Sequence, residues 1–394
     1  MTGKPKISFD NTEIAFKRYS NRELKLAKLL FAMFNYKTVV EYAPPITAFA
    51  LRIGIPIKGL VRATIFDHFC GGESIEDCDK AVKALYKKGI GAILDYSVEG
   101  EQDETDFIAN YEEILSTIDK AAESDEYPFA VFKPTGIGRF AIYEKVNAND
   151  ELSNDESAQY QNIKNRFLGL CQRAYDKKVP LFIDAEESWV QDCFDELVEE
   201  MMQKFNRDEV IVFNTVQLYR KGRIDYMEGL YQRASEAGFK VGLKLVRGAY
   251  MEKERERALE MHYPSPIQDN KADSDKDYNR AIELCFEHMS ITKVCVGTHN
   301  EESTHLVAQL LAESGLEIND DRFWFAQLYG MSDHISFNLS NAGYNVAKYL
   351  PYGPIVSVLP YLSRRAQENS SVAGQSGREI SLIKKELARR RNAG

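Results

Sequence analysis

The sequence predicts an α/β protein whose main domain is a (β/α)8 barrel of the TIM type, distorted and preceded by an N-terminal helical extension. From residue 89 onward, short runs of β-branched and apolar residues alternate with longer segments of helical character. This is the pattern of parallel strands joined by helical crossovers. The runs number eight, as this barrel requires. A barrel of roughly 250 residues and a helical arm together use nearly all of the chain.

The expected strands are short and apolar. They cover residues 89–97, 129–136, 180–186, 210–219, 239–250, 293–300, 323–330 and 345–353. The segments between them, such as 110–123, 193–205 and 226–238, place apolar residues three and four positions apart. That spacing is typical of amphipathic helices. Two crossovers, 137–179 and 251–292, are longer than one helix needs, so we expect them to contain a lid or a surface insertion.

Helical segments flank the barrel at both ends of the chain. The expected domains are a helical arm over 1–88, the catalytic barrel over 89–372 and a basic helical tail over 373–394. Within the arm, 73–89 is the clearest helix. Pro44, Pro45 and Pro56 are expected to break the residues before it into shorter pieces, because proline interrupts a helix interior.

Composition and charge narrow the class of protein. With 44% hydrophobic and 11% aromatic residues, the chain can fill a large core and is not disordered. Its formal net charge of −10 gives no overall basic surface for nucleic acid. The six cysteines show no CxxC spacing, so we expect reduced, mostly buried thiols.

The expected location is cytoplasmic. No uncharged apolar run approaches the roughly 18 residues that span a bilayer, and the first residues lack the apolar core of a signal peptide. The tail segment 378–391 has six basic and two acidic residues, with Ile380, Ile383 and Leu387 on one side. A helix of this kind can bind a membrane surface or cover the barrel. The sequence leaves both alternatives open.

Polar residues gather at the C-terminal ends of the expected strands, where barrel enzymes place their catalytic groups. Lys133 follows four apolar residues. It can bind a carboxylate, form a Schiff base or pair with Asp184. Asp184 itself needs a nearby cation, which Lys133 or Lys244 would supply. A structural ion pair and a direct part in chemistry are equally consistent with this position of Asp184.

The segment KLVRGAY, residues 244–250, predicts an anion site. Lys244 and Arg247 precede a glycine that lets the backbone approach a ligand, which suits an anionic ring or a pyrophosphate. The segment lacks the GxGxxG form, so no Rossmann-type site is expected. His299 and His305 are not at the three- or four-residue spacing of helical metal ligands, and we expect no metal.

The last expected helix carries an arginine pair, Arg364 and Arg365. Helical spacing puts Tyr361, Arg364 and Glu368 on one face, with Arg365 one step round. Two converging guanidinium groups can grip one carboxylate with paired donors, which lysine cannot imitate. Taken alone, the pair is more typical of two solvated surface arginines.

Seven motifs accompany the second to eighth expected strands in chain order. They are FKPTGIG, FIDAE, VQLYRK, KLVRGAY, GTHN, QLYGMSD and YLPYGP...PYLSRRAQENSS. In this order they resemble the proline dehydrogenase family, flavoenzymes that oxidise L-proline to 1-pyrroline-5-carboxylate. The resemblance covers roughly residues 60–372, and its final block, with Arg-Arg-x-x-Glu, is the most specific.

The resemblance implies that L-proline and non-covalent FAD bind at the C-terminal strand ends. The substrate carboxylate would be bound by Lys133, Arg364 and Arg365, and the ring would be walled by Leu328, Tyr349 and Tyr361. The groups expected to serve catalysis are Asp184, Lys244 and Lys133. The implied FAD contacts are Ala185, Gln217, Lys244, Arg247, Gly248, Ala249, Tyr250, Thr298, His299 and Glu368.

Two positions refine the resemblance. Lys244, expected near flavin N5, stands where many bacterial members carry arginine, and follows the pattern of eukaryotic members. Tyr349 matches members that act on proline, because its bulk disfavours a hydroxyl on the ring, so proline is preferred to hydroxyproline.

The chain ends after the barrel, which leads us to expect a monofunctional enzyme. The family's membrane quinone implies a peripheral position at the inner face of the cytoplasmic membrane.

Two other classes of protein are kept as alternatives. A Schiff-base aldolase on the same fold would use Lys133 or Lys244 as its nucleophile. A non-catalytic module would bind proline without reducing an electron acceptor. The visible spectrum of the purified protein separates the first alternative from a flavoenzyme, and dye reduction with proline separates the second.

Overall fold

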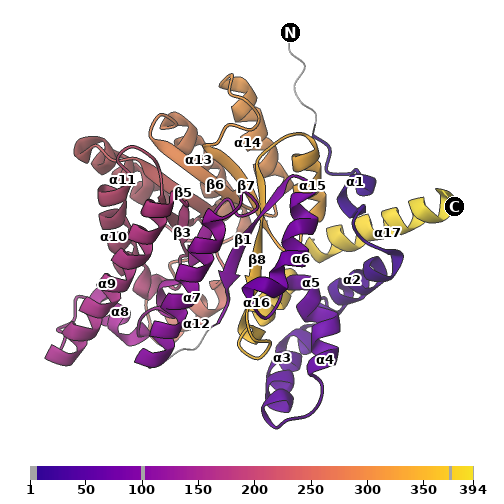
Figure 1. The fold of residues 1–394 in the computed structure, drawn as a ribbon, viewed down its shortest axis with the longest axis horizontal. Helices are drawn as coiled ribbons and strands as arrows, with labels where there is room; N and C mark the ends of the chain where they lie inside the picture. Colours follow the sequence, from indigo (N-terminus) through magenta and orange to yellow (C-terminus); the bar gives the residue numbers. More distant parts are fainter. Residues whose placement is uncertain (1–6, 99–102, 372–374, 394) are drawn as a thin grey trace. The chain divides into compact units, whose positions relative to one another are not determined.

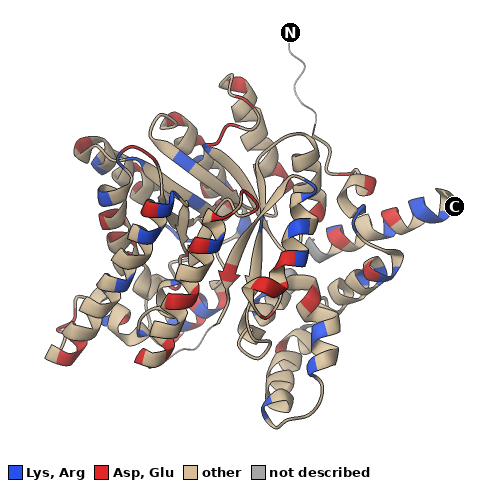
Figure 2. Cartoon of the chain, viewed as in Figure 1, with Lys and Arg blue, Asp and Glu red and all other residues tan. Residues whose placement is uncertain are grey.

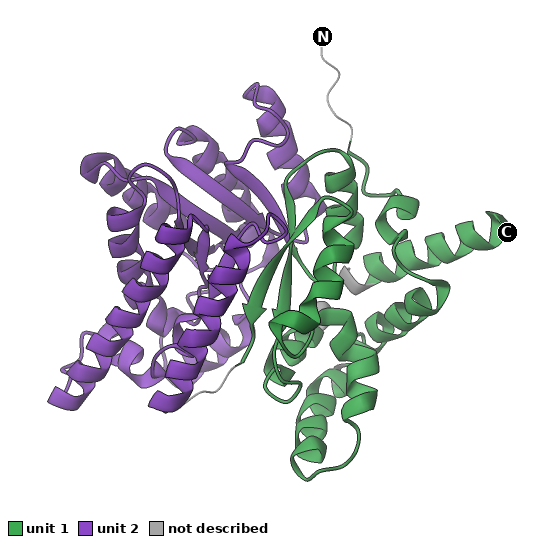
Figure 3. Ribbon diagram, viewed as in Figure 1, with its two compact units in different colours: residues 1–99, 327–394 green, residues 100–326 purple. Residues whose placement is uncertain are grey.

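The structure is a computed structural model (Figure 1). It describes residues 7–98, 103–371 and 375–393, without the side chains of Lys37, 368–371 and 375–376. The chain divides into two compact units, of which unit 1 comprises 1–99 and 327–394 and unit 2 comprises 100–326 (Figure 3).

Eight parallel strands with helices between them form the (β/α)8 barrel fold that the sequence predicts. They are β1 (Ile90–Tyr96), β2 (Ala130–Phe132), β3 (Leu181–Ile183), β4 (Val212–Gln217), β5 (Val241–Val246), β6 (Thr292–Gly297), β7 (Phe323–Leu328) and β8 (Val346–Tyr352). Their order in the sheet is β1-β8-β7-β6-β5-β4-β3-β2. The first strand pairs with the last, and β1 and β2 stand at the two ends of this order.

Most strands end earlier than the sequence predicts. In the expected run 129–136, the strand stops at Phe132, and Pro134–Gly136 forms a 3-10 turn, η2. Proline has no N–H to donate to a strand ladder, so the sheet cannot continue through Pro134. Lys133 consequently lies in the loop after the strand, at the point where this fold places functional groups.

Unit 2 contains the helices that follow β1 to β6. They are α7 (Glu104–Ala122), α8 (Phe140–Asn147), α9 (Asn154–Lys177), α10 (Ser188–Phe205), α11 (Arg223–Ala237), α12 (Met251–Glu260), α13 (Lys271–Glu287) and α14 (Glu301–Glu313). Both long crossovers are largely helical, with α8 and α9 in the first and α12 and α13 in the second. The residue that terminates α11 is Gly238, in the left-handed conformation typical of such an end.

Three buried phenylalanines pack inside the sheet of unit 2. Phe129 stacks on Phe182 with ring centroids 4.3 Å apart, and Phe213 meets both rings edge-on. The Nζ of Lys244 lies 5.3 Å from the centroid of the Phe182 ring. Aromatic packing therefore ends where a group of charged side chains begins.

Unit 1 contains β1, β8 and the helices from both ends of the chain. They are α1 (Thr12–Phe16), α2 (Asn21–Met33), α3 (Lys37–Arg52), α4 (Lys58–Val61), α5 (Asp67–Phe69), α6 (Ile75–Tyr86), α15 (Asp333–Asn341), α16 (Leu359–Ser371) and α17 (Gln375–Ala393). A π-helical turn, η1 (Arg62–Phe66), joins α4 to α5. The expected helix over 73–89 is present as α6, capped by the Ser74 side chain.

Helix α3 runs through Pro44 and Pro45, so the expected break at these residues is wrong. Each proline removes one helical N–H donor. Val40 before the prolines and Leu51 after them both pack into the core of unit 1, and this packing favours one continuous helix. The expected break at Pro56 is correct, because this residue lies between α3 and α4.

The C-terminal helix α17 packs against α1 and α2. Ile383 is buried in the core of unit 1, and Ile380 and Leu387 pack against the same core. The apolar side of the tail is therefore covered by its own unit, which favours the second of the two alternatives for this helix.

Asp333, at the start of α15, is a buried carboxylate held by two cations. Its Oδ1 lies 2.7 Å from the Nζ of Lys348 on β8, and its Oδ2 lies 3.2 Å from Arg18 of the arm. The Tyr19 hydroxyl also donates to Oδ2, at 2.7 Å. Burial alone would raise the pKa of Asp333, but Lys348 and Arg18 outweigh it and hold the pKa well below its usual range. This group ties the arm to the last strand.

All six cysteines are buried and free, as the sequence predicts. Within the described ranges, no helix is long and apolar enough to cross a membrane. The same residues include no group of three or more histidine, cysteine, aspartate or glutamate side chains that could hold a metal ion.

Candidate active site

Lys133, Asp184 and Lys244 form a charged cluster at the strand ends of unit 2. Asp184 follows β3 and accepts a hydrogen bond from the Nζ of Lys244 on β5. Its second oxygen lies 3.9 Å from the Nζ of Lys133, which is beyond hydrogen-bond distance. The three side chains are between 7% and 13% exposed. The sequence left open whether Asp184 forms an ion pair or takes part in chemistry, and the structure shows it paired with both lysines.

The backbone after β2 and β3 fixes the first two members of this cluster. The Asp184 N–H donates to the Phe132 carbonyl at 2.9 Å, so the loops after the two strands stay in register. Lys133 occupies the cap position of the η2 turn, one residue beyond Phe132. The turn and the register together hold both side chains at the same level of the sheet.

Glu186 is a further residue of this site, because it holds the turn that follows Lys133. Its two carboxylate oxygens accept from the N–H and the hydroxyl of Thr135 at 3.0 and 2.7 Å. Burial, followed by the charge of Glu187, raises the pKa of Glu186 to about 8, against the opposing effects of Thr135 and Lys133. The sequence places Glu186 at a strand end but gives no sign of its contact with Thr135.

The cluster carries a positive charge near neutral pH. Two ammonium groups oppose one aspartate, and Glu186 is mostly protonated below pH 8 because its pKa is raised to about that value. Nearly buried charge is costly unless it is compensated. The two lysines make this end of the sheet a suitable environment for an anionic ligand such as a carboxylate.

Arg247 is held in a fixed orientation just beyond β5. Its Nε donates to Asp275 of α13 at 2.7 Å, and its Nη1 donates to Thr298 at 2.7 Å. Ser303 accepts from the third nitrogen at 3.0 Å, and the Tyr278 ring lies under the guanidinium. Burial alone would raise the pKa of Asp275, but Lys271 and Arg247 outweigh it and lower the pKa. Sequence patterns did not identify Asp275 as this partner.

Gly248 has a packing role that the sequence does not reveal. Its φ is +138°, and a Cβ at this position would lie 2.3 Å from the Tyr219 ring. The glycine is therefore required by its contact with Tyr219, whether or not a ligand approaches the backbone. Ala249 and Tyr250 follow directly, and Tyr250 is the cap residue of α12.

Gln217, the last residue of β4, has a buried acceptor without a partner. The side chain is 3% exposed, and its Oε1 makes no hydrogen bond among the described residues. The Thr215 hydroxyl, two residues earlier on the same side of the strand, is also without one there. Buried polar atoms are normally satisfied, so these atoms are suited to a polar ligand.

The other expected cofactor contacts of unit 2 lie at the ends of β3 and β6. Ala185 is buried beside Asp184. Thr298 is buried, accepts from Arg247 and also accepts from the Asn300 N–H. His299 is half-buried and precedes the N-cap of α14.

The expected substrate contacts of unit 1 lie on β7, β8 and α16. Tyr349 is 9% exposed and follows Lys348, which points toward α15, so the tyrosine lies on the opposite face of β8. Leu328 is half-buried at the end of β7, and Tyr361 is buried in α16.

The arginine pair is not a pair of solvated surface residues. Arg365 is 6% exposed, and its guanidinium carbon lies 4.9 Å from the centroid of the Tyr361 ring. Arg364 is half-buried. The fourth expected residue of this helix, Glu368, has a side chain outside the described part of the structure.

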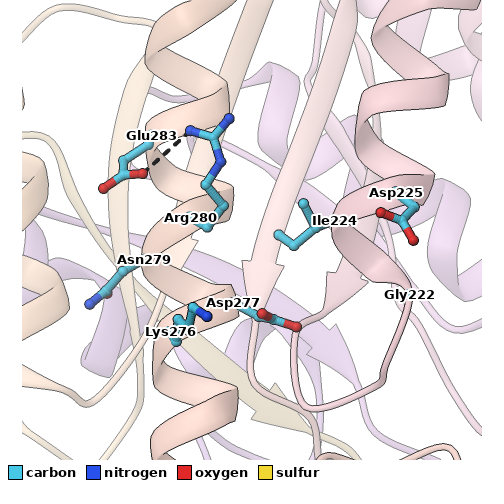
Figure 4. A pocket seen from close by; sticks show the side chains of 8 residues that line it. All are labelled: Gly222, Ile224, Asp225, Lys276, Asp277, Asn279, Arg280 and Glu283. Atoms are coloured by element: carbon cyan, nitrogen blue, oxygen red, sulfur yellow. Dashed lines mark hydrogen bonds and ion pairs between the residues drawn. The ribbon is translucent and has the colours of Figure 1, made fainter.

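A separate pocket of about 570 Å³ lies in unit 2 between the first turn of α11 and the middle of α13 (Figure 4). Its lining consists of Gly222, Ile224, Asp225, Lys276, Asp277, Asn279, Arg280 and Glu283. None of the expected site residues is among them. The lining mixes acidic and basic side chains, and Arg280 pairs with Glu283 inside the pocket at 3.3 Å. The pocket is therefore a surface depression apart from the strand-end cluster.

The fold and the cluster are typical of one class of protein, the barrel enzymes whose functional groups lie at the C-terminal ends of the strands. The model of the proline dehydrogenase family matches residues 78–378, which is most of the chain. The protein belongs to the proline dehydrogenase family.

Individual relatives agree with this assignment. The carbapenem antibiotics biosynthesis protein CarD of Pectobacterium carotovorum is 36% identical over 84% of this chain and 86% of its own. Human mitochondrial proline dehydrogenase 1 is 40% identical over 62% of this chain and 41% of its own. A hydroxyproline dehydrogenase of Xenopus laevis is 29% identical over 98% and 90%.

Solved structures share the fold. Proline utilization A from Bdellovibrio bacteriovorus, inactivated by N-propargylglycine, superposes with a TM-score of 0.72 at 20% identity. It covers 95% of this chain, whereas this chain spans 40% of that protein's length.

Proposed function

We propose that this protein oxidises L-proline to 1-pyrroline-5-carboxylate with a non-covalently bound FAD. The observation that carries the proposal is the charged cluster of Lys133, Asp184 and Lys244. It supplies a net positive charge at the strand ends of a barrel that belongs to the proline dehydrogenase family. An enzyme of this kind would carry out the first step of proline catabolism.

Lys133, Arg364 and Arg365 are proposed to bind the substrate carboxylate. Lys133 lies in the loop directly after β2, where its ammonium is near the strand ends, and its side chain is 13% exposed. Asp184 holds Lys244 and offsets one of the two lysine charges of the cluster. Tyr349, Tyr361 and Leu328 are proposed to wall the proline ring, which positions the carbon that loses a hydride.

The residues present fit a flavin. A flavin ring carries N–H and C=O groups, and the unpartnered Oε1 of Gln217 can accept from such an N–H. Arg247, oriented by Asp275 and Thr298, presents a cation to an anionic part of the cofactor. When bound, FAD supplies the hydride acceptor at N5. Its remaining proposed contacts are Ala185, Lys244, Gly248, Ala249, Tyr250, Thr298, His299 and Glu368.

A Schiff-base mechanism is disfavoured for Lys244. The amine of an aldolase lysine must be neutral to attack a carbonyl. Lys244 instead donates a hydrogen bond to Asp184, an arrangement that suits an ammonium ion. Membership of the proline dehydrogenase family likewise favours the flavin-dependent reaction.

The electron acceptor is proposed to be a membrane quinone. A lipid-soluble acceptor requires the enzyme to work at a membrane surface, and we propose a cytoplasmic protein that is peripheral at the inner face. The human relative named above is mitochondrial, where the corresponding surface is that of a mitochondrial membrane.

Hydroxyproline is the second candidate substrate, because a hydroxyproline dehydrogenase matches 98% of this chain. We favour proline, since Tyr349 is a nearly buried and bulky side chain that disfavours a hydroxylated ring. One extra or missing methylene, or one added hydroxyl, in an apolar pocket commonly changes kcat/KM by roughly 10- to 200-fold. We expect a preference for proline in that range.

The test is steady-state reduction of a dye by the purified protein with each substrate, with chemical trapping of the pyrroline product. The proposal predicts turnover of L-proline and a much lower kcat/KM for trans-4-hydroxy-L-proline. Equal values would remove the preference, and binding of proline without dye reduction would indicate a non-catalytic binding module.

A further inference from the structure

Helix α3 exposes a stripe of large apolar residues. Tyr42, Ile46, Phe49 and Ile53 are 56%, 64%, 64% and 57% exposed. Their spacing of four, three and four residues puts them on one side of a helix. Single exposed apolar residues are ordinary, but a contiguous set marks an interaction surface.

The exposed stripe is additional to the side of α3 that folds against unit 1. Val40 is buried in the core of unit 1, and Ala48 and Leu51 pack against that core. Helix α3 also packs against α16. The helix thus has one apolar side for its own fold and a second that the described residues leave open to solvent.

The same kind of surface continues through the turn into α4. Ile55 in the turn is 44% exposed and Leu60 in α4 is 66% exposed. The two helices form a hairpin that extends from the body of unit 1 (Figures 1 and 3). We call residues 37–61 the α3–α4 hairpin.

The charges on the hairpin are mostly basic. Glu41, beside Tyr42, is its one acidic residue, and from residue 42 to residue 66 the chain has no aspartate or glutamate but has Arg52, Lys58 and Arg62; Figure 2 shows the hairpin end without red. Lys58 and Arg62 reach Glu73 at 2.9 and 3.2 Å yet stay 60% and 46% exposed. A chain with a net charge of −10 therefore has an excess of basic residues at the end of this hairpin, beside the exposed apolar stripe.

We propose that the α3–α4 hairpin docks on the surface of an anionic lipid bilayer, with the stripe of Tyr42, Ile46, Phe49 and Ile53 inserted at the headgroup boundary. Apolar side chains flanked by arginine and lysine are what an interfacial helix uses, since burial of the apolar face and attraction to anionic headgroups act together. This surface deepens the proposed function, and it rests on that proposal's placement of the protein at a membrane surface. Vesicle binding and dye reduction by proline are separate measurements, so the failure of one does not imply the failure of the other.

A lipid surface fits the hairpin better than a second copy of the chain does. In a two-fold contact the same patch meets itself, so the basic residues of both copies would be brought together. An anionic headgroup layer instead meets those residues with opposite charge. The tail helix α17 is a weaker candidate for the same role, because its apolar residues Ile380, Ile383 and Leu387 pack in unit 1.

The experiment is co-sedimentation of the full-length protein with vesicles of phosphatidylglycerol and phosphatidylcholine, and with vesicles of phosphatidylcholine alone. We expect binding to the anionic vesicles that weakens in high salt. The variant Phe49→Glu/Ile53→Glu should lower the partition coefficient at least ~10-fold, because it puts two carboxylates into the inserted stripe.

The matched control is Leu259→Glu/Met261→Glu, which makes the same charge change at residues that are 76% and 60% exposed at the end of α12. We expect this control to retain most of the binding. If both double variants lose vesicle binding to the same extent, the loss comes from the change in net charge. That result would overturn the assignment of the hairpin as the docking surface.

A second measurement does not require the charged variant to fold. Phe49→Trp should shift its fluorescence emission to shorter wavelength when anionic vesicles are added, relative to the unaltered protein with its two tryptophans. Absence of both sedimentation and this shift would overturn the proposal. A second result would also overturn it: the unaltered protein does not bind vesicles, and its apparent molecular mass falls in the variant Phe49→Glu/Ile53→Glu. This result would mean that a second copy of the chain covers the stripe.

Discussion

Two groups in this protein combine one aspartate with two cations, and they differ in how completely the aspartate is held. In unit 1, Asp333 makes an ion pair with Lys348 at 2.7 Å and with Arg18 at 3.2 Å, and also accepts from Tyr19. In unit 2, Asp184 is hydrogen-bonded to Lys244, while Lys133 stays 3.9 Å away.

We take this difference to separate a structural group from the proposed functional one. Both cations of Asp333 are engaged at close distance and the Lys348 side chain is fully buried, so the group stabilises the fold. Lys133 lies farther from Asp184 than either cation lies from Asp333. Each group has one carboxylate and two cations, and the distances between these charges differ.

The largest effect is expected for Asp333→Ala. The substitution leaves Lys348 and Arg18 buried without their carboxylate, which costs about 3–5 kcal/mol of stability. Urea denaturation should show a much lower midpoint, with the KM for proline of the folded fraction little changed. The matched variant Asp184→Ala should lose less stability and more activity. The reverse pattern would break the distinction between the two groups.

The second prediction concerns the arginine pair. Arg364→Ala or Arg365→Ala should raise the KM for proline and lower kcat/KM roughly 30- to 1000-fold, as expected when a charged partner of a bound carboxylate is removed. The flavin should stay bound, as judged by the ratio of visible to ultraviolet absorbance. Loss of flavin with little change in KM would mean that these residues serve the cofactor instead.

A smaller effect is expected from pH. Glu186 is mostly protonated below its pKa of about 8 and ionised above it. Ionisation adds a negative charge beside Lys133, so affinity for an anion should fall as the pH rises through this value. The dissociation constant of tetrahydro-2-furoate, the oxygen analogue of proline, should increase roughly 3- to 10-fold above pH 8.

Glu186→Gln is the control for this pH dependence. Glutamine cannot ionise and can still accept from Thr135, so the variant should bind the analogue with the same affinity on both sides of pH 8. If the variant Glu186→Gln still loses affinity for the analogue above pH 8, the pH dependence must come from another ionisable group.

An effect of similar size is expected at Tyr349, which lies on the side of β8 opposite Lys348. Tyr349→Ser should raise the ratio of hydroxyproline to proline kcat/KM about 10-fold by making room for the ring hydroxyl. Steady-state assays with both substrates measure this ratio. A ratio that stays constant would remove Tyr349 from the walls of the substrate site.

The sequence predicts the strands better than it predicts the roles of side chains. Alternation of apolar runs and helices is a local signal, and it locates all eight strands, each overlapping its expected run. The contact of Glu186 with Thr135 and that of Arg247 with Asp275 join residues far apart in the chain, so no local pattern reveals them.

Two expectations failed or changed for reasons of packing. The prolines of α3 do not break that helix, because core contacts before and after them hold it together. Gly248 is explained by the Tyr219 ring, whereas the sequence suggested only the approach of a ligand. In both cases the outcome depends on tertiary contacts. Local residue propensities do not contain this information.

The most direct test of the central claim is the visible spectrum of the purified protein before and after anaerobic addition of L-proline. We predict a flavin absorption band that bleaches with proline, and that bleaches far less at the same proline concentration in Lys133→Ala. A colourless protein, or a flavin band that proline leaves unchanged in the unaltered protein, would contradict the assignment of this chain as an FAD-dependent proline dehydrogenase.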